Sequence, residues 1–198
     1  MKFFLATKNL KKLDELQRIL APLGITVICE RDLSYQLEEV EENGSTFEEN
    51  AIIKAKFAME ATGLPAIADD SGLCVDALGG APGIYSARFA GEPCDNDKNN
   101  QKLLALLKGK TISERGAKYV SSVACCFPDG RIITVMGECK GYIAEEFQGS
   151  GGFGYDPLFI SEMGSFGIIS PEEKDSISHR GRALKKLYDK LSIILSEE

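Results

Sequence analysis

Residues 66–91 read AIADDSGLCVDALGGAPGIYSARFAG, and the prediction of the fold starts from this stretch. A short apolar run ends in two adjacent carboxylates, Asp69 and Asp70, and glycines and prolines follow among small residues. The apolar run is typical of a buried strand, and we expect a long functional loop from there to Gly91. An Asx-type turn would also explain the aspartates, but the glycines would let backbone approach a ligand closely.

Outward from this stretch, apolar periodicity and turn signals predict an alternation of strands and helices. In chain order we expect a strand (2–6), a helix (10–20), a strand (25–30), a helix (45–63), the strand AIAD (66–69), a helix (97–108), a hairpin (118–127 and 131–139), a glycine-rich loop (149–157), a helical piece from 170 and a C-terminal helix (179–195). Ser45 and Glu48 fit a capping box at the start of the second helix. Alternation followed by a hairpin indicates an α/β fold with a mixed sheet.

Composition limits the possible functions. The chain has 198 residues, is 43% hydrophobic and 27% charged, and carries a net charge of −7, so we expect a single globular domain over 1–198 that does not bind nucleic acid. Six cysteines without a Cys-x-x-Cys pair, and one histidine, argue against structural zinc. We find no signal peptide and no apolar run long enough for a membrane, which predicts a reduced, cytoplasmic protein.

The turn TKNLKK follows the first predicted strand. Its members are Thr7, Lys8, Asn9, Leu10, Lys11 and Lys12. Lysines together with the backbone N–H groups at the start of a helix can hold phosphate, although the glycine pattern of a P-loop is absent. Taken alone, these residues are better explained as a run of solvated lysines on a helix.

An acidic run comes before the second helix. It contains Glu38, Glu39, Glu41 and Glu42. Such a run is usually a solvated surface. If it lies near Asp69 and Asp70, however, the cluster would offer the hard oxygen ligands that suit Mg²⁺ bound to substrate phosphates.

The glycine-rich loop GGFGYDP carries Phe153 and Tyr155 beside Asp156. Aromatic side chains can stack on a nucleobase. The alternative is a turn whose aromatic side chains pack into the core.

The segment SPEEKDSISHRGRAL places Lys174, His179 and Arg180 around the start of a helix. Ser178 could cap this helix and leave its neighbours exposed in the first turn. Cations are not favoured at a helix N-terminus, so their presence there indicates a ligand. Together these segments would supply a phosphate site, a carboxylate cluster, a surface for stacking and a hydrogen-bond donor to the edge of the base. These are the parts of an enzyme that acts on a nucleoside triphosphate.

Five motifs in this order resemble the signature blocks of the inosine/xanthosine triphosphate pyrophosphatase family. They are ATKNLKK (6–12), EENGSTFEENAIIKA (41–55), LPAIADDSGLCVDALGGAPGIYSARFAG (64–91), GSGGFGYDPLF (149–159) and EEKDSISHRGRAL (172–184). The resemblance extends from residue 3 to about residue 187. It implies an elongated central mixed β-sheet flanked by helices, two lobes with a cleft between them, a homodimer, Mg²⁺, and hydrolysis of ITP, dITP or XTP to the monophosphate and pyrophosphate.

The resemblance also implies roles for individual residues. Thr7 to Lys12 would hold phosphate, Glu41 and Asp70 would bind the metal, and Ser71 would contact the substrate. The nucleoside side of the pocket would contain Phe153, Gly154, Tyr155, Asp156, Lys174, His179 and Arg180. Asp70 would activate a water that attacks the α-phosphorus, although spacing alone leaves Asp69 as an alternative.

Two stretches depart from the family pattern. Lys8 stands where many members have glycine, and SEMGSFGIISPEEK (161–174) is shorter and richer in glycine than the pattern. Two other functions would use some of the same residues. A nucleotide-binding regulatory module would not need Glu41, Asp69 and Asp70 together, and a phosphatase or kinase would cut the β–γ bond instead.

Overall fold

The computed structural model describes residues 1–7, 9–38 and 40–196, and at Leu10 and Lys11 it describes only the backbone. The phosphate role predicted for Lys8 therefore lies outside the described residues. The strands and α-helices are β1 (Lys2–Leu5), α1 (Leu10–Leu20), β2 (Thr26–Ile28), α2 (Phe47–Thr62), β3 (Ala66–Val75), α3 (Asn96–Leu106), β4 (Gly116–Cys126), β5 (Ile132–Ile143), β6 (Phe159–Ser161), β7 (Gly164–Ser165), α4 (Pro171–Ile177) and α5 (His179–Ser196). Short 3₁₀ helices occupy Ala21–Leu23, Glu30–Asp32, Asp76–Leu78, Gly83–Arg88 and Ile112–Glu114.

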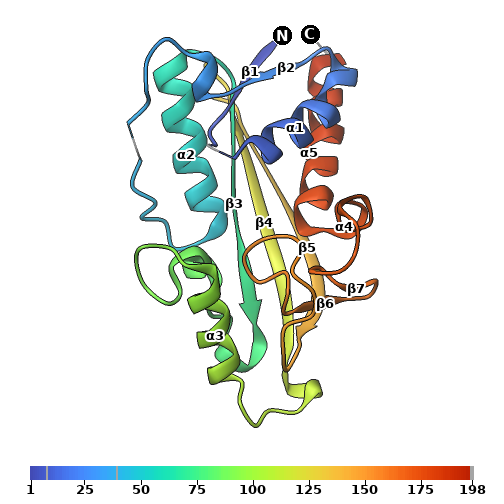
Figure 1. Cartoon of the computed structure of the whole chain (residues 1–198). Coiled ribbons are helices and arrows are strands. Elements are labelled where there is room, and N and C mark those ends of the chain that lie inside the picture. The colour runs from blue at the N-terminus through green and yellow to red at the C-terminus, as the bar shows by residue number, and fades with distance from the viewer. Residues whose placement is uncertain (8, 39, 197–198) are drawn as a thin grey trace. The chain divides into compact units, whose positions relative to one another are not determined.

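The described strands form one mixed sheet of seven, in the order β2-β1-β3-β4-β5-β6-β7 (Figure 1). β1 pairs in parallel with β2 and β3, and β6 pairs antiparallel with β5 and β7. A short turn joins β4 to β5, with the N–H of Phe127 donating to the carbonyl of Arg131, and a turn this short can join only antiparallel strands. The prediction of an α/β fold with a mixed sheet is confirmed.

The chain divides into two compact units. The first unit contains Met1–Asp70, Ser121–Met136 and Arg182–Glu198, and the second contains Ser71–Val120 and Gly137–Gly181. Strands β3, β4 and β5 contribute residues to both units. Two units agree with the expected two lobes, and the expected cleft stays a prediction.

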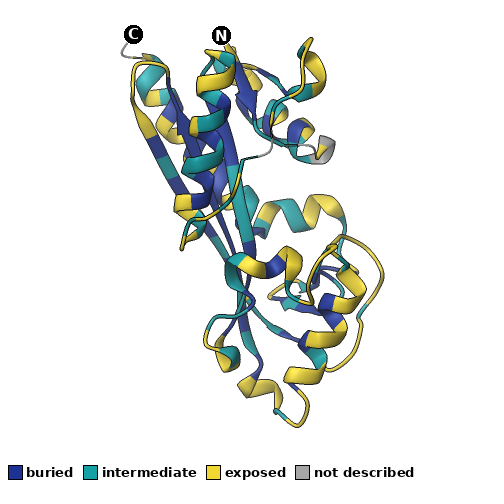
Figure 2. Ribbon diagram, turned by 90° about the vertical axis from the view of Figure 1, so that its left-hand side faces the viewer, coloured by how far each residue is buried: buried dark blue, intermediate teal, exposed yellow. Residues whose placement is uncertain are grey.

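In the first unit, alternate strand residues face opposite sides of the sheet. On β1, Phe3 and Leu5 pack with the apolar residues of α1 and α5, whereas Phe4 packs with residues of α2. On β4, Val123 and Ala124 divide in the same way. This is the period-two alternation of a strand that is buried on both faces. Figure 1 shows α2 on one side of these strands and α1 with α5 on the other, and Figure 2 shows the strands largely buried.

The second unit has its own core. Its buried residues include Leu73 and Val75 of β3, Leu103 of α3 and Phe159 of β6.

Arg115 is buried in this unit. Its guanidinium donates to the carbonyl oxygens of Leu107, Ile143 and Ala144 at 2.7–2.8 Å. A buried cation is tolerated only when it is bonded in this way, so Arg115 ties α3 to the end of β5.

Three local expectations need correction. The strand predicted at 66–69 does not end at Asp69, because β3 continues to Val75 and the long loop begins only after it. The N-cap of α2 is Thr46, whose side chain accepts from the N–H of Glu49, so the pairing of Ser45 with Glu48 was wrong. Strands β6 and β7 were not predicted, since each is only two or three residues long.

Candidate active site

The two aspartates lie on β3 just beyond the end of β1. The last register pair between these strands is Leu5 with Ile67, after which the chain of β1 turns away into α1. β3 is fully buried up to Ala68 and becomes partly exposed at Asp69 and Asp70. Ligand sites of open α/β sheets form at this position, outside the carboxyl ends of parallel strands.

Because adjacent residues on a strand face opposite sides of the sheet, the two carboxylates meet different helices. Asp69 is on the same face as Ile67, which packs with α1 and α5, whereas Asp70 is on the same face as Ala68, which packs with α2. Each aspartate therefore has its own lysine, and the assignment of Asp70 as the base, with Asp69 as the alternative, stays a prediction.

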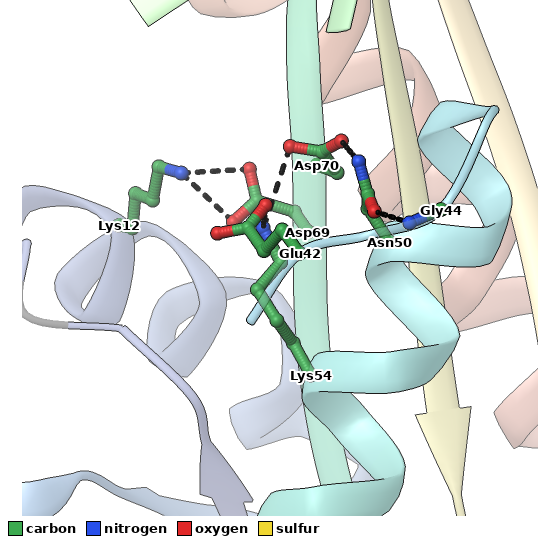
Figure 3. A network of polar contacts seen from close by, with 7 residues as sticks. All are labelled: Lys12, Glu42, Gly44, Asn50, Lys54, Asp69 and Asp70. Atoms are coloured by element: carbon green, nitrogen blue, oxygen red, sulfur yellow. Dashed lines mark hydrogen bonds and ion pairs between the residues drawn. The ribbon is translucent and has the colours of Figure 1, made fainter. Parts of the chain in front are cut away.

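Asp69 binds Lys12 of α1. The Nζ atom of Lys12 donates to both carboxylate oxygens at 2.9 Å, and the side chain of Asp69 is 8% exposed (Figure 3). Lys12 lies in the first turn of α1, directly after the turn that begins at Thr7. Asp69 therefore holds in place one of the lysines predicted to bind phosphate.

Asp70 binds Lys54 of α2. The Nζ atom of Lys54 lies 3.3 Å from Oδ1 of Asp70 and 2.9 Å from Oε2 of Glu42, so one ammonium group joins two carboxylates (Figure 3). Oδ2 of Asp70 accepts a bond of 3.1 Å from the amide of Asn50. We call Lys12, Glu42, Asn50, Lys54, Asp69 and Asp70 the carboxylate network.

Burial and charge shift two pKa values in this network. Burial raises the pKa of Asp70, and the negative charge of Glu42 adds to the rise, while Lys54 and Asn50 oppose it without cancelling it. Burial by itself would lower the pKa of Lys54, but Asp70 and Glu42 outweigh burial and raise it. Lys54 thus stays protonated, and the charged form of Asp70 is disfavoured.

Among the described residues of the acidic run, Glu42 bonds Lys54, the lysine that also binds Asp70. Glu41 is exposed, and its metal role stays a prediction. Among the described residues no three His, Cys, Asp or Glu side chains gather as a metal-binding group. Asp70 and Glu42 nevertheless direct carboxylate oxygens at the same ammonium group, that of Lys54. Mg²⁺ takes one or two carboxylates when substrate phosphates complete its coordination.

The turn before α1 is held by local hydrogen bonds. Oγ1 of Thr7 accepts from the N–H of Asn9 at 3.2 Å, and the carbonyl of Asn9 accepts from the N–H groups of Lys12 and Leu13. Leu10 and Lys11 form the first residues of α1. This arrangement agrees with the expected helix start, and phosphate binding there stays a prediction.

A cavity of about 330 Å³ opens beside the network in the first unit. Glu42, Lys54 and Thr7 line one part of it, and the apolar side chains include Leu37 and Phe57. Lys54, which binds Asp70, and Glu42 are therefore accessible from a hollow in the surface.

The second unit contains a separate group of predicted site residues. Asp156 is buried, and its carboxylate accepts from the N–H of Phe153 at 2.7 Å, from the hydroxyl of Tyr119 at 3.3 Å and from Nζ of Lys174 at 2.5 Å. A Cβ on Gly152, at φ +75°, would lie 2.1 Å from Oδ2 of Asp156, so glycine is required there. Asp156 therefore shapes the loop and holds Lys174.

Two cations lie near the ring of Phe153. The ring of Phe153 is 50% exposed, Nζ of Lys174 lies 4.8 Å from its centroid, and Cζ of Arg180 lies 5.9 Å from it. His179 is buried and stacks on Tyr119 at 4.7 Å. We call Tyr119, Phe153, Asp156, Lys174, His179 and Arg180 the aromatic cluster. Phe153 is the ring in this cluster that is open to a base.

Tyr155 does not provide the aromatic face expected of it. Its ring is 3% exposed in the core, and its hydroxyl donates to the carbonyl of Ser86 at 2.8 Å. The carbonyl of Gly154 accepts from the amide of Asn100, which fixes the same loop. Ser71 lies half-buried on β3, directly after Asp70. Ser178 caps the start of α5, as expected, by accepting from the N–H of Gly181.

Sequence reasoning missed Asn50 and Lys54. Both lie on α2 four residues apart, so they occupy one face of the helix, beside Ala51 and Ala55 of its buried face. An asparagine within a helix is unfavourable by propensity, and this was the signal that could have identified it.

The chain resembles known proteins over nearly its full length. The model of the Ham1 family matches residues 3–190. A protein of Desulforamulus reducens named dITP/XTP pyrophosphatase is 51% identical over 194 residues, which cover 97% of this chain and 96% of that protein. One of the same name from Geobacter sulfurreducens is 50% identical over 188 residues, 94% of each.

Among solved structures, a HAM1 protein from Coxiella burnetii superposes with a TM-score of 0.90 at 40% identity, covering 97% of this chain and 98% of that one. In the described part of the chain, every helix is too short or too polar to cross a membrane.

Proposed function

The chain belongs to the Ham1 family, and from that premise we propose that it hydrolyses non-canonical purine nucleoside triphosphates such as dITP and XTP. Relatives that are 50–51% identical to this chain over nearly its whole length are named dITP/XTP pyrophosphatase, which supports this activity. The observation that carries the proposal is the pair of carboxylates, Asp70 and Glu42, joined by Lys54 beside the Lys12–Asp69 pair. A module that only bound nucleotide would not need this combination.

Asp70 is the residue that we assign to activation of water. Its carboxylate is partly buried, and burial raises its pKa toward the range in which a general base is effective. We propose that it takes a proton from a water that attacks the α-phosphorus of the substrate. The α–β anhydride bond then breaks, and the products are a nucleoside monophosphate and pyrophosphate.

Asp70 and one glutamate of the acidic run would hold Mg²⁺. Glu42 is bonded to the same ammonium group as Asp70, and Glu41 is its neighbour in the loop. Carboxylate oxygens and substrate phosphates are the ligands that this ion prefers. When bound, it neutralises phosphate charge and stabilises the charge that develops during hydrolysis.

The remaining predicted residues divide between the two ends of the substrate. Thr7 to Lys12 would take the triphosphate, with Lys12 held by Asp69. Phe153 would stack on the base, and Ser71 would contact the substrate next to Asp70.

Arg180 would donate to O6 of the purine, with Lys174 and His179 beside it. Arginine has only donors, so it matches the carbonyl of hypoxanthine or xanthine and not the amine of adenine.

We further propose a homodimer in the cytoplasm that does not bind nucleic acid. The net charge of −7 supports the last point, because a nucleic-acid backbone attracts basic surfaces. The dimer is implied by the family.

The test is a panel of ITP, XTP, dITP, GTP and ATP with MgCl₂, in which pyrophosphate and orthophosphate are both measured. We expect the deaminated purines to be hydrolysed fastest, with one pyrophosphate released per monophosphate, and no turnover in EDTA. Release of IDP with orthophosphate would contradict cleavage of the α–β bond and would favour a phosphatase.

A further inference from the structure

Asn50 connects the two segments that carry Asp70 and Glu42. It is 2% exposed on α2, and its amide has a defined partner on each side. Oδ1 accepts from the N–H of Gly44 at 2.8 Å, and Nδ2 donates to Oδ2 of Asp70 at 3.1 Å (Figure 3). Because a backbone N–H can only donate, the bond to Gly44 fixes which side of the amide is oxygen. The nitrogen must therefore face Asp70.

The two oxygens of Asp70 are held by two residues of one helix. Oδ2 accepts from Asn50 and Oδ1 accepts from Lys54, which lies four residues later on the same face of α2. Two bonds to different oxygens fix the plane of the carboxylate as well as its position.

Gly44 lets the acidic loop come close to α2. A Cβ at position 44 would lie 2.6 Å from Oδ1 of Asn50 and 2.8 Å from Cβ of Glu49, so any larger residue would push the loop outward. Glu42 stands two residues before this contact and bonds Lys54. Asn50 thus clamps the loop of Glu42 and the strand of Asp70 at the same time.

We propose that Asn50 is a positioning residue for hydrolysis: it fixes the carboxylate of Asp70 and, through Gly44, the placement of Glu42 beside it. This inference rests on the proposed function, since it concerns the same carboxylates. The competing view is that Asn50 is an ordinary buried amide that stabilises the fold and nothing more.

Asn99 provides a matched control for that view. It is also 2% exposed and also lies on a helix, α3. Its Oδ1 accepts from the N–H of Ala90 at 2.6 Å, and its Nδ2 donates to the carbonyl of Ala87 at 2.9 Å. It therefore makes the same kinds of bonds as Asn50, but to backbone groups only.

The experiment compares the wild type with Asn50→Ala, Asn50→Asp and Asn99→Ala. For each protein we would measure kcat and KM for ITP, the affinity for Mg²⁺ by calorimetry without nucleotide, and the free energy of unfolding in urea. Loss of a group that orients a ligand or base costs about 10–100-fold in activity or metal affinity.

We expect Asn50→Ala to lower kcat and Mg²⁺ affinity by about 10–100-fold each, with KM for ITP nearly unchanged. Asn99→Ala should lose comparable stability but keep the wild-type kcat and the wild-type affinity for Mg²⁺. Asn50→Asp retains an acceptor for Gly44 and loses the donor to Asp70, so it should also lose kcat, and it remains informative if the alanine variant does not fold.

Wild-type kcat in Asn50→Asp, or an equal loss of kcat in Asn99→Ala, would overturn the inference. If the wild type hydrolyses no nucleotide, the proposed function fails, while the Mg²⁺ affinities still decide the role of Asn50.

Discussion

Replacement of Lys54 by methionine tests the electrostatics of the carboxylate network. The carboxylates of Asp70 and Glu42 both bond Nζ of Lys54, so their oxygens lie no more than about 6 Å apart. At that separation two charges repel by about 3 kcal/mol with an effective dielectric constant of about 20. The side chain of Glu42 is 36% exposed, so solvent reduces the repulsion to about 1–2 kcal/mol. Loss of the charged hydrogen bond to Asp70 adds about 1.5–2 kcal/mol.

We therefore expect Lys54→Met to lose about 2.5–4 kcal/mol of unfolding free energy at neutral pH. Without the ammonium group, which lowers it, the pKa of Asp70 rises further above its unfolded value. The folded state then binds the proton more tightly than the unfolded state, so the stability loss is full above the folded pKa. The loss relative to the wild type shrinks as the pH is lowered from neutral through the raised pKa of Asp70.

The assay is urea unfolding of both proteins across that pH range. Lys56→Met is the control, because Lys56 lies on the same helix but is 60% exposed and 4.0 Å from Glu60, and we expect a change within about 0.5 kcal/mol. A loss in Lys54→Met that stays the same at every pH would contradict this electrostatic explanation, since it would show that the alkyl chain of Lys54 contributes by packing.

Three further predictions concern activity. Asp70→Asn should lower kcat by about 100-fold or more without lowering the urea midpoint, because burial makes its charge costly; near-normal turnover would place the base elsewhere. Glu42→Gln should lower the pKa of Asp70 and move the acid limb of the pH–rate profile to lower pH, whereas Glu41→Gln should not; an identical shift in both would contradict the network. Arg180→Ala should cost ITP about 1.5–3 kcal/mol in kcat/KM and ATP much less; proportional losses for both would mean that Arg180 binds phosphate.

The sequence predicted the elements whose periodicity is strong. The helices that became α1, α2, α3 and α5 have apolar residues at helical spacing, and the hairpin of β4 and β5 has a clear turn. The continuation of β3 past Asp69 could not be predicted, because SGLCV has neither the apolar run nor the polar alternation of a strand. β6 and β7 are too short to produce a pattern.

For the candidate site, the sequence predicted which residue types take part but not how their side chains are arranged. Residue types indicated the chemistry, but which carboxylate meets which lysine depends on the face of β3, and that follows only once the strand is known to continue. Burial likewise decides between two aromatic residues that the sequence cannot separate: Phe153 is exposed and Tyr155 lies in the core. Asn50 bonds Asp70 and Glu42 bonds Lys54 across segments that are distant in sequence, and no local pattern predicts these partners.

The position of attack on the triphosphate decides whether Asp70 activates water toward the α-phosphorus. Hydrolysis of ITP in water labelled with the heavy isotope of oxygen, followed by mass spectrometry of both products, reports which phosphorus the water attacks. If Asp70 activates a water toward the α-phosphorus, the label appears in IMP and the pyrophosphate stays unlabelled. Label in the pyrophosphate, with IMP unlabelled, would place the attack on the β-phosphorus and would contradict the account.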